Sequence, residues 1–364
     1  MTSGNAKTLP LNDMHTAAGA RFGSFAGWHM PLTYPLGVLK EHLWTRQDAG
    51  LFDISHMRLF AVEGPQAATL LSRACPLDAA ALPLGQGKLS FFLDEQAGIL
   101  DDLIVTRTGA ERFVVVANAG NAESDEKHLR VLAAGHDCKV EVLPFAFLAL
   151  QGPKAEDVLR RAGFGPLPER FMTGLELEGG GFVSRSGYTG EDGFEIGLPA
   201  EQARALAEKL LADERVRWIG LAARDSLRLE AGLCLHGQDI SPETDPVAAG
   251  LLWAIPKPLR EKGGFLGAEA LAALGSPKRR RCGLRPEGRL PVRAGAPLFD
   301  ETGRPVGTVT SGSFGPSVDH PVAMGLLDSE LVLPGQPLHT EVRGTKIPVT
   351  VHALPFTPHR FRKG

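Results

Sequence analysis

Residues 89–117 read LSFFLDEQAGILDDLIVTRTGAERFVVVA and contain three strand-like runs joined by short turns. The runs cover Leu89–Leu93, Ile99–Thr106 and Arg112–Ala117. A parallel crossover needs a dozen residues or more, so these strands are predicted to pair antiparallel. Helix-like stretches lie on both sides of them, and the segment is therefore predicted to have an α+β fold.

The flanking sequence extends the α+β pattern, and the C-terminal tail departs from it. Helices are predicted at Pro35–Ala49, Gln66–Arg73, Ala122–Ala133, Lys154–Arg161 and Glu201–Ala212. From about Cys282 onward, short strand-like runs alternate with Gly/Pro turns, which is typical of a small barrel or sandwich. Since 364 residues are many for one core, we expect two interleaved α+β modules over residues 1–275 and a β module over residues 282–364.

The basic run at residues 275–281 (GSPKRRR) marks the predicted boundary. Charge runs are usually solvated, so an exposed linker between modules is the simpler interpretation. The alternative is a docking patch for an acidic partner or for a polyanionic ligand tail.

Composition restricts the classes of function. A formal net charge of −3 argues against a protein whose main ligand is a nucleic-acid backbone. The four cysteines are far apart and form no CxxC pair, so neither a zinc site nor a disulfide framework is expected. No apolar run reaches membrane-spanning length, and no targeting segment is recognisable. We expect a cytoplasmic protein without a metal, or a protein of the mitochondrial matrix if the chain is a processed form.

No P-loop, HExxH, GxSxG or GxGxxG motif is present, so a less standard site is expected. The first candidate is a pair of charged residues inside an apolar, strand-like segment. Residues 98–105 read GILDDLIV. Adjacent strand residues face opposite ways, so only one of Asp101 and Asp102 can point into a given pocket. A carboxylate in an apolar strand is costly unless it is paired or functional. The alternative is an edge-strand aspartate in contact with solvent.

Residues 185–195 (RSGYTGEDGFE) form a second candidate. Their glycines allow the backbone to approach a ligand closely. Tyr188 offers a flat face with a polar end, and Glu195 is a charge in an apolar strand. The simpler alternative is an ordinary β-turn.

Residues 220–237 (GLAARDSLRLEAGLCLHG) form a third candidate, predicted to be helical. A helix places Arg224 and Arg228 on one face, where carboxylates are their natural partners. One arginine can anchor a ligand while the other bridges modules. Alternatively, both lie on a solvated face with Asp225 and Glu230 as local partners.

Five separated motifs, in this order, resemble those of the glycine cleavage T-protein family. They are residues 50–57 (GLFDISHM), 98–105 (GILDDLIV), 186–193 (SGYTGEDG), 223–232 (ARDSLRLEAG) and 308–312 (TVTSG). The resemblance extends from about Leu9 to about Phe361. It implies three modules arranged as a cloverleaf around a central folate channel, with a β-barrel as the last module.

The resemblance also implies the residues of the site. Asp101 matches the family's essential carboxylate, which contacts the reduced pterin. The residues implied to bind folate are Asn118, Tyr188, Glu195, Arg224 and Phe361. Leu89 departs from the family, because relatives usually carry a tyrosine there; the leucine keeps an apolar contact and loses a hydroxyl donor.

The implied reaction transfers a one-carbon unit. The donor is an aminomethyl group on the lipoyl arm of a carrier, the H protein, and the acceptor is tetrahydrofolate. The expected function is therefore that of the aminomethyltransferase of the glycine cleavage system, which releases ammonia. One alternative is a tetrahydrofolate-dependent demethylase or methyltransferase of the same fold that acts on a small methylated substrate. A non-catalytic folate-binding protein of iron–sulfur assembly is disfavoured, because its Lys-Gly-Cys signature is absent.

Overall fold

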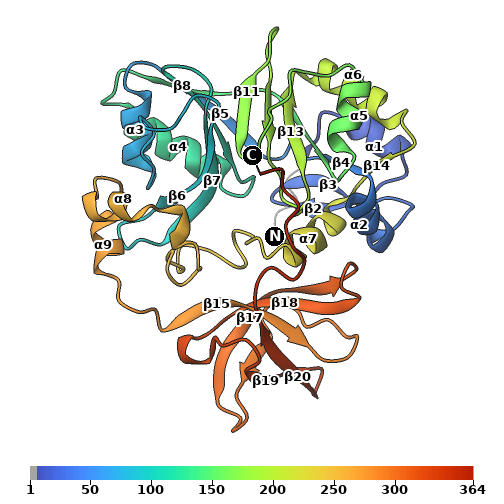
Figure 1. The fold of residues 1–364 in the computed structure, drawn as a ribbon, viewed down its shortest axis with the longest axis vertical. Helices are drawn as coiled ribbons and strands as arrows, with labels where there is room; N and C mark the ends of the chain where they lie inside the picture. The colour runs from blue at the N-terminus through green and yellow to red at the C-terminus, as the bar shows by residue number, and fades with distance from the viewer. Residues whose placement is uncertain (1–5, 364) are drawn as a thin grey trace.

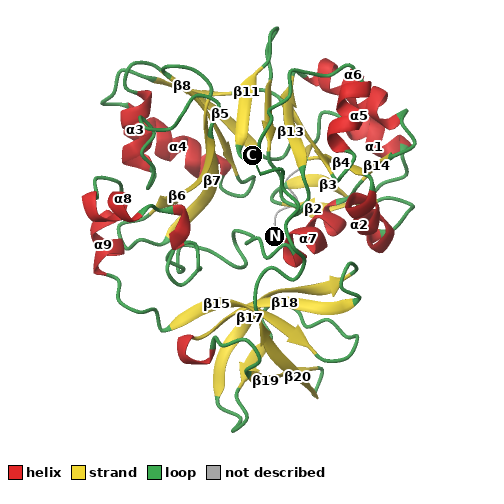
Figure 2. Ribbon diagram, in the orientation of Figure 1, coloured by secondary structure: helices red, strands yellow, loops and turns green. Residues whose placement is uncertain are grey.

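The computed structural model describes residues 6–363 and has three lobes (Figure 1). Two α+β lobes lie side by side, and a β lobe lies below them in this view. Helices lie on the outer sides of the two upper lobes, whereas the lower lobe is almost entirely strand (Figure 2). The α+β class and the three-module arrangement expected from the sequence are confirmed.

The first lobe is built on a six-stranded sheet in the order β11-β12-β13-β10-β4-β14. Its strands are β4 (Ala49–Asp53), β10 (Ala146–Gln151), β11 (Thr173–Glu176), β12 (Phe182–Arg185), β13 (Gly193–Leu198) and β14 (Val216–Trp218). Neighbours pair antiparallel except β14, which is parallel to β4. A small sheet of β1 (Lys7–Thr8), β3 (Trp28–Thr33) and β2 (Arg21–Phe25) adjoins it.

Helices cover both faces of this sheet. One face packs on α1 (Asn12–Ala17), α5 (Ala155–Arg161) and α6 (Ala200–Leu211) through an apolar core. The other face packs on α7 (Leu221–Glu230) through Ala223 and Leu227. Helix α7 thus lies at the centre of the molecule, where the lobes meet (Figure 1).

The predicted helix at residues 35–49 was too long. Helix α2 covers only Val38–Gln47, and the next residues form β4. All of Ala49–Asp53 is buried and pairs with β10 on one side and β14 on the other. These pairings across the sheet override the local helical pattern.

The second lobe is a five-stranded antiparallel sheet in the order β6-β7-β8-β5-β9. Its strands are β5 (Arg58–Glu63), β6 (Gly87–Leu93), β7 (Ile99–Arg107), β8 (Arg112–Ala117) and β9 (Lys139–Val142). The predicted antiparallel pairing of residues 89–117 is confirmed. Helices α3 (Ala67–Ala74) and α4 (Ala122–Ala133) cover one face. Helices η1 (Leu252–Ala254), α8 (Lys257–Lys262) and α9 (Ala268–Ala273) pack by the β6 end of the sheet.

The third lobe is a closed barrel in the order β15-β18-β17-β16-β19-β20. Its strands are β15 (Arg279–Pro286), β16 (Pro297–Phe299), β17 (Pro305–Gly315), β18 (His320–Asp328), β19 (Pro337–Val342) and β20 (Thr345–His352), with η2 (Ser329–Leu331) between β18 and β19. Closure leaves no free strand edge. The predicted barrel is confirmed. The linker interpretation is wrong for residues 279–281, because they pair with β18 as the start of β15.

The C-terminal tail after β20 leaves the barrel and returns to the centre of the molecule (Figure 1). The backbone N–H groups of Phe356 and Thr357 donate to the carbonyl of Glu230, at 2.9 and 3.0 Å. Further on, the N–H of Arg360 donates to the carbonyl of Gly190 at 2.8 Å. The last residues are therefore part of the structure between the lobes.

Candidate active site

A cavity of about 1270 Å³ lies where the three lobes meet. Five of the six predicted site residues line it, namely Asn118, Tyr188, Glu195, Arg224 and Phe361. They come from the second lobe, the first lobe and the C-terminal tail. The cavity exceeds the ~300–1,000 Å³ common for a single small ligand, so it has room for two reactants.

Asp101 and Asp102 face opposite sides of β7. Asp102 and Ile104 are half-buried and line the cavity, whereas Asp101 and Val105 point to the face covered by α3 and α4. Asp101 is completely buried, and it does not line the cavity. The strand alternation expected from the sequence is present, but the carboxylate that it presents to the cavity is Asp102.

Asn118 and Asn121 hold the two aspartates in place. Asp101 accepts hydrogen bonds from the backbone N of Asn118 at 3.0 Å, from Asn118 Nδ2 at 2.9 Å and from Asn121 Nδ2 at 2.7 Å. Asn118 Nδ2 also lies 3.0 Å from Asp102 Oδ1 and 2.9 Å from the Asp102 carbonyl. The Asn118 amide therefore links the buried carboxylate to the one on the cavity wall.

Asp102 is suited to exchange a proton near neutral pH. Burial, followed by the charge of Asp101, raises the pKa of Asp102 to about 7, and the hydrogen bond from Asn118 opposes the shift. A group whose pKa lies near the working pH is an effective proton acceptor and donor.

Arg224 presents to the cavity a cation that is not neutralised by a carboxylate of the described residues. Its guanidinium lies 4.5 Å from the ring centroid of Tyr188, and the Tyr188 hydroxyl donates to the Cys234 carbonyl. Within residues 6–363, the Arg224 guanidinium makes neither an ion pair nor a hydrogen bond. Burial lowers the pKa of Arg224, while its neighbours Tyr188 and Glu195 oppose the shift. A desolvated guanidinium of this kind is prepared for a ligand that brings hydrogen-bond acceptors.

Glu195 on β13 brings a carboxyl group to the same region. Ser186 Oγ donates to Glu195 Oε2 at 2.6 Å and is its only hydrogen-bond partner within the described part of the chain. Burial raises the pKa of Glu195, and the hydrogen bond from Ser186 and the charge of Arg224 oppose the shift. The carboxyl group has free capacity to accept N–H donors from a ligand.

Arg228, one helical turn after Arg224, is only 1% exposed and joins α7 to the barrel. It donates to Asp239 Oδ2 at 2.6 Å and to Ser311 Oγ of β17 at 2.8 Å. The sequence-based prediction that one arginine bridges modules is confirmed. The alternative of two arginines on a solvated helix face is wrong.

The C-terminal tail closes one side of the cavity. The ring of Phe361 stacks on Phe171, and His359 Nε2 lies 2.8 Å from the Ala231 carbonyl. Phe171, His359 and Phe361 all line the cavity.

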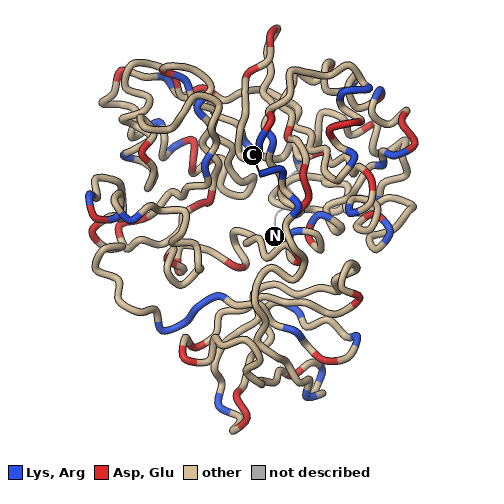
Figure 3. Tube along the Cα trace, viewed as in Figure 1, with Lys and Arg blue, Asp and Glu red and all other residues tan. Residues whose placement is uncertain are grey.

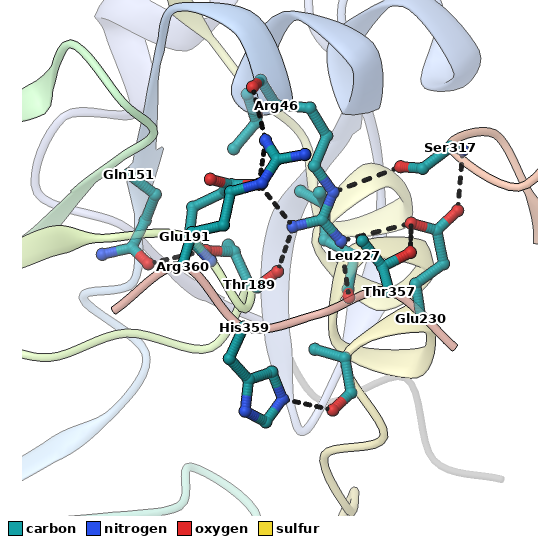
Figure 4. Close-up of polar contacts among 12 residues, drawn as sticks. Arg46, Gln151, Thr189, Glu191, Leu227, Glu230, Ser317, Thr357, His359 and Arg360 are labelled. Carbon is teal, nitrogen blue, oxygen red and sulfur yellow. Dashed lines mark hydrogen bonds and ion pairs between the residues drawn. The ribbon is translucent and has the colours of Figure 1, made fainter. Parts of the chain in front are cut away.

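A buried ion-pair network anchors this tail (Figure 4). Arg46 of α2 donates to Glu191 at 3.0 Å and to Glu230 at 3.2 Å. Glu230 also accepts from Thr357 in the tail and, at 2.8 Å, from the backbone N of Ser317 in the barrel. One carboxylate thus connects α2, α7, the barrel and the tail.

Sequence reasoning did not single out His56, which also lines the cavity. It is 3% exposed, and its Nδ1 has no partner within residues 6–363. Burial, followed by the charge of Arg224, lowers the pKa of His56 to about 3, so the ring is neutral. Its position inside the motif GLFDISHM was the available signal. Leu89 also lines the cavity, as its place in the family pattern suggested.

Comparisons with known proteins agree with this architecture. The GCVT N-terminal domain matches residues 11–258, and the glycine cleavage T-protein C-terminal barrel domain matches residues 279–357. The human protein "Aminomethyltransferase, mitochondrial" is 43% identical over 98% of this chain and 91% of its own length. The protein of the same name from Dictyostelium discoideum is 37% identical over 100% of this chain and 95% of its own.

A solved structure gives the same result for the fold. The crystal structure of glycine cleavage system aminomethyltransferase T from Bartonella henselae matches with a TM-score of 0.97 and 58% identity, and covers 99% of this chain and 100% of its own. These matches define the class as an aminomethyltransferase. The chain belongs to the glycine cleavage T-protein family.

Proposed function

We propose that the chain is the aminomethyltransferase of a glycine cleavage system. It transfers the methylene carbon of an aminomethyl group from a lipoylated carrier, the H protein, to tetrahydrofolate, and ammonia is released. The observation that carries the proposal is the cavity between the lobes. It is lined by Asp102, Glu195 and Arg224 and has room for two reactants.

Tetrahydrofolate fits the donors and acceptors that this cavity offers. The guanidine-like edge of a pterin carries N–H donors that match the Glu195 carboxyl group, and its acceptors match the unpaired Arg224. Tyr188, Phe361 and Leu89 supply apolar and aromatic surface for flat rings. We therefore assign folate binding to these residues together with Asn118.

We assign to Asp102 the catalytic role that the family resemblance gave to Asp101. Of the two, Asp102 reaches the cavity, and the Asn118 amide fixes its orientation. A carboxylate there stabilises positive charge on a reacting nitrogen and can accept a proton from it. Within residues 6–363 no group of three or more His, Cys, Asp and Glu side chains is arranged to hold a metal ion.

The lipoylated carrier is the proposed protein partner. In the basic run at residues 275–281 Arg279 pairs with Asp328, and in the basic tail at residues 360–363 Arg360 pairs with Glu191 and Arg362 with Glu156, so part of the charge of each stretch is already neutralised. Charges of both signs are interspersed over the three lobes (Figure 3). No helix in the described part of the chain is long and apolar enough to cross a bilayer; the cytoplasmic location stays a prediction.

Ammonia release from aminomethylated carrier, measured with and without tetrahydrofolate, tests the proposal. We expect release that depends on folate and is lost in Asp102→Asn. Folate-dependent turnover of small methylated amines, without turnover of the carrier, would instead support a demethylase.

A further inference from the structure

Behind the cavity wall, a third carboxyl group lies against the aspartate pair. Asp125 is on α4, the helix that covers the face of the sheet to which Asp101 points. It is 2% exposed, and its carboxyl group is in hydrogen-bonding contact with that of Asp101. Two carboxyl groups can share such a contact only when one of them carries a proton.

The donors around the two groups decide which of them is ionised. Asp101 accepts three N–H hydrogen bonds, from Asn118 and Asn121. In contrast, no N–H group within residues 6–363 donates to the side chain of Asp125, and its Oδ2 is buried. N–H donors stabilise an ionised carboxylate, and a buried carboxylate without them is costly. The shared proton therefore belongs to Asp125.

The titratable groups near the pair add no positive charge. Burial lowers the pKa of His128 on α4, so its ring is neutral. His236, in the loop after α7, accepts from Asn121 at Nδ1 (2.9 Å) and donates from Nε2 to the Ile99 carbonyl (3.0 Å). This is the pattern of a neutral imidazole. Cys75, at the end of α3, is a buried thiol whose pKa burial raises.

Neutral groups also face Asp102 from the other elements around it. Burial raises the pKa of Tyr188 and of Cys234, so both are uncharged at neutral pH. Arg224 lies on the same cavity, where its charge acts on Tyr188 and Glu195. The charge that acts on the pKa of Asp102 is that of Asp101, next to it on β7.

We propose that Asp125 is a positioning residue, which donates its proton to Asp101 and so keeps Asp101 ionised beside Asp102. This inference rests on the proposed role of Asp102. A fixed negative neighbour makes Asp102 hold its own proton more tightly than an isolated carboxyl group would. The proton shared by Asp101 and Asp125 thus sets the pH at which the cavity carboxylate becomes active.

The pH profile of kcat/KM for ammonia release gives the first test. Asp125→Leu removes the donor to Asp101, so on this proposal the negative charge next to Asp102 is weakened. We expect the acid limb of the profile to move down by about one pH unit or more. Asp125→Asn keeps an N–H donor toward Asp101 and should return the limb to its wild-type position. A limb that stays in place in Asp125→Leu, or moves equally in both variants, would overturn the proposal.

Infrared difference spectroscopy gives a second test that does not depend on turnover. At neutral pH, wild type minus Asp125→Asn should show the carbonyl stretch of a protonated carboxyl group. The control is Glu126→Gln, which removes a carboxylate paired with Arg130 at 3.0 Å and should leave that band in place. If the band is missing from the Asp125→Asn difference, Asp125 is not the proton carrier, whatever reaction the enzyme catalyses.

Discussion

The rings of Phe171 and Phe361 stack almost parallel, with their centroids 3.8 Å apart and their planes inclined by 4°. Phe171 precedes β11 of the first lobe, whereas Phe361 belongs to the tail that follows the barrel. Both rings line the central cavity. The chain thus uses its last residues to complete a wall that the first lobe begins.

Removal of this stack should weaken folate binding. Aromatic pairs contribute ~0.5–1.5 kcal/mol beyond the area they bury, and ~1.4 kcal/mol corresponds to tenfold in affinity. We expect Phe361→Ala to weaken tetrahydrofolate binding about tenfold in titration calorimetry. Phe299→Ala, which removes a ring stacked on His339 in the barrel, is the control. Wild-type affinity in Phe361→Ala would exclude the tail from the binding wall.

The two arginines of α7 should respond differently to truncation. Arg224→Ala removes a cation that makes no ion pair within residues 6–363, so stability should change little. Folate affinity should fall by ~2–5 kcal/mol, the cost of losing one partner of a desolvated charged contact. Arg228→Ala leaves the buried carboxylate of Asp239 without its cation, and should lower the free energy of unfolding by ~3–5 kcal/mol.

Urea unfolding and calorimetry of both variants check this contrast. The assignment fails if Arg224→Ala is the destabilised variant, or if it binds folate as tightly as wild type does.

Glu230 should stabilise the junction of α2, α7, the barrel and the tail in a pH-dependent way. Burial opposes its ionisation, but the hydrogen bond from His42 and the charge of Arg46 lower the pKa of Glu230 to about 2. A folded-state pKa below the unfolded value of ~4.3 means that its contribution is complete above pH ~4.3. The contribution is lost as the pH falls from there toward 2.

Glu230→Gln should therefore lower the free energy of unfolding by roughly 3 kcal/mol at neutral pH. The difference from wild type should shrink progressively below about pH 4. Denaturant titrations at several pH values measure it, and a difference that is the same at pH 3 and at pH 7 would contradict the role of the ionised carboxylate.

Leu89→Tyr restores the residue that relatives usually carry on this part of the cavity wall. The added hydroxyl can make one hydrogen bond, worth about 1 kcal/mol net. We expect tetrahydrofolate to bind modestly tighter, by about fivefold, with the same donor used. If the variant gained aminomethyl transfer that the natural enzyme lacks, the assignment of the reaction would be wrong.

The sequence predicted local patterns well and spatial choices less well. Strand periodicity established that Asp101 and Asp102 face opposite sides, but the side that faces the cavity depends on where α3 and α4 pack. Likewise, helical spacing placed Arg224 and Arg228 on one face of α7. Only the position of Ser311 on the barrel shows that Arg228 is the arginine that joins α7 to the barrel. The predicted helix at residues 35–49 ran on into β4, because partners distant in sequence decide whether a buried segment becomes a strand.

Turnover of the two aspartate variants tests the central claim most directly. The measurement is kcat for ammonia release from aminomethylated carrier at saturating tetrahydrofolate, across a range of pH. Asp102→Asn should lose roughly a hundred- to ten-thousand-fold at every pH while folate still binds, as expected when a positioned proton-transfer group is removed. Asp101→Asn should retain far more activity, with its acid limb at lower pH. A loss in Asp101→Asn as large as that in Asp102→Asn, or larger, would contradict the assignment of Asp102 as the carboxylate that faces the reacting atoms.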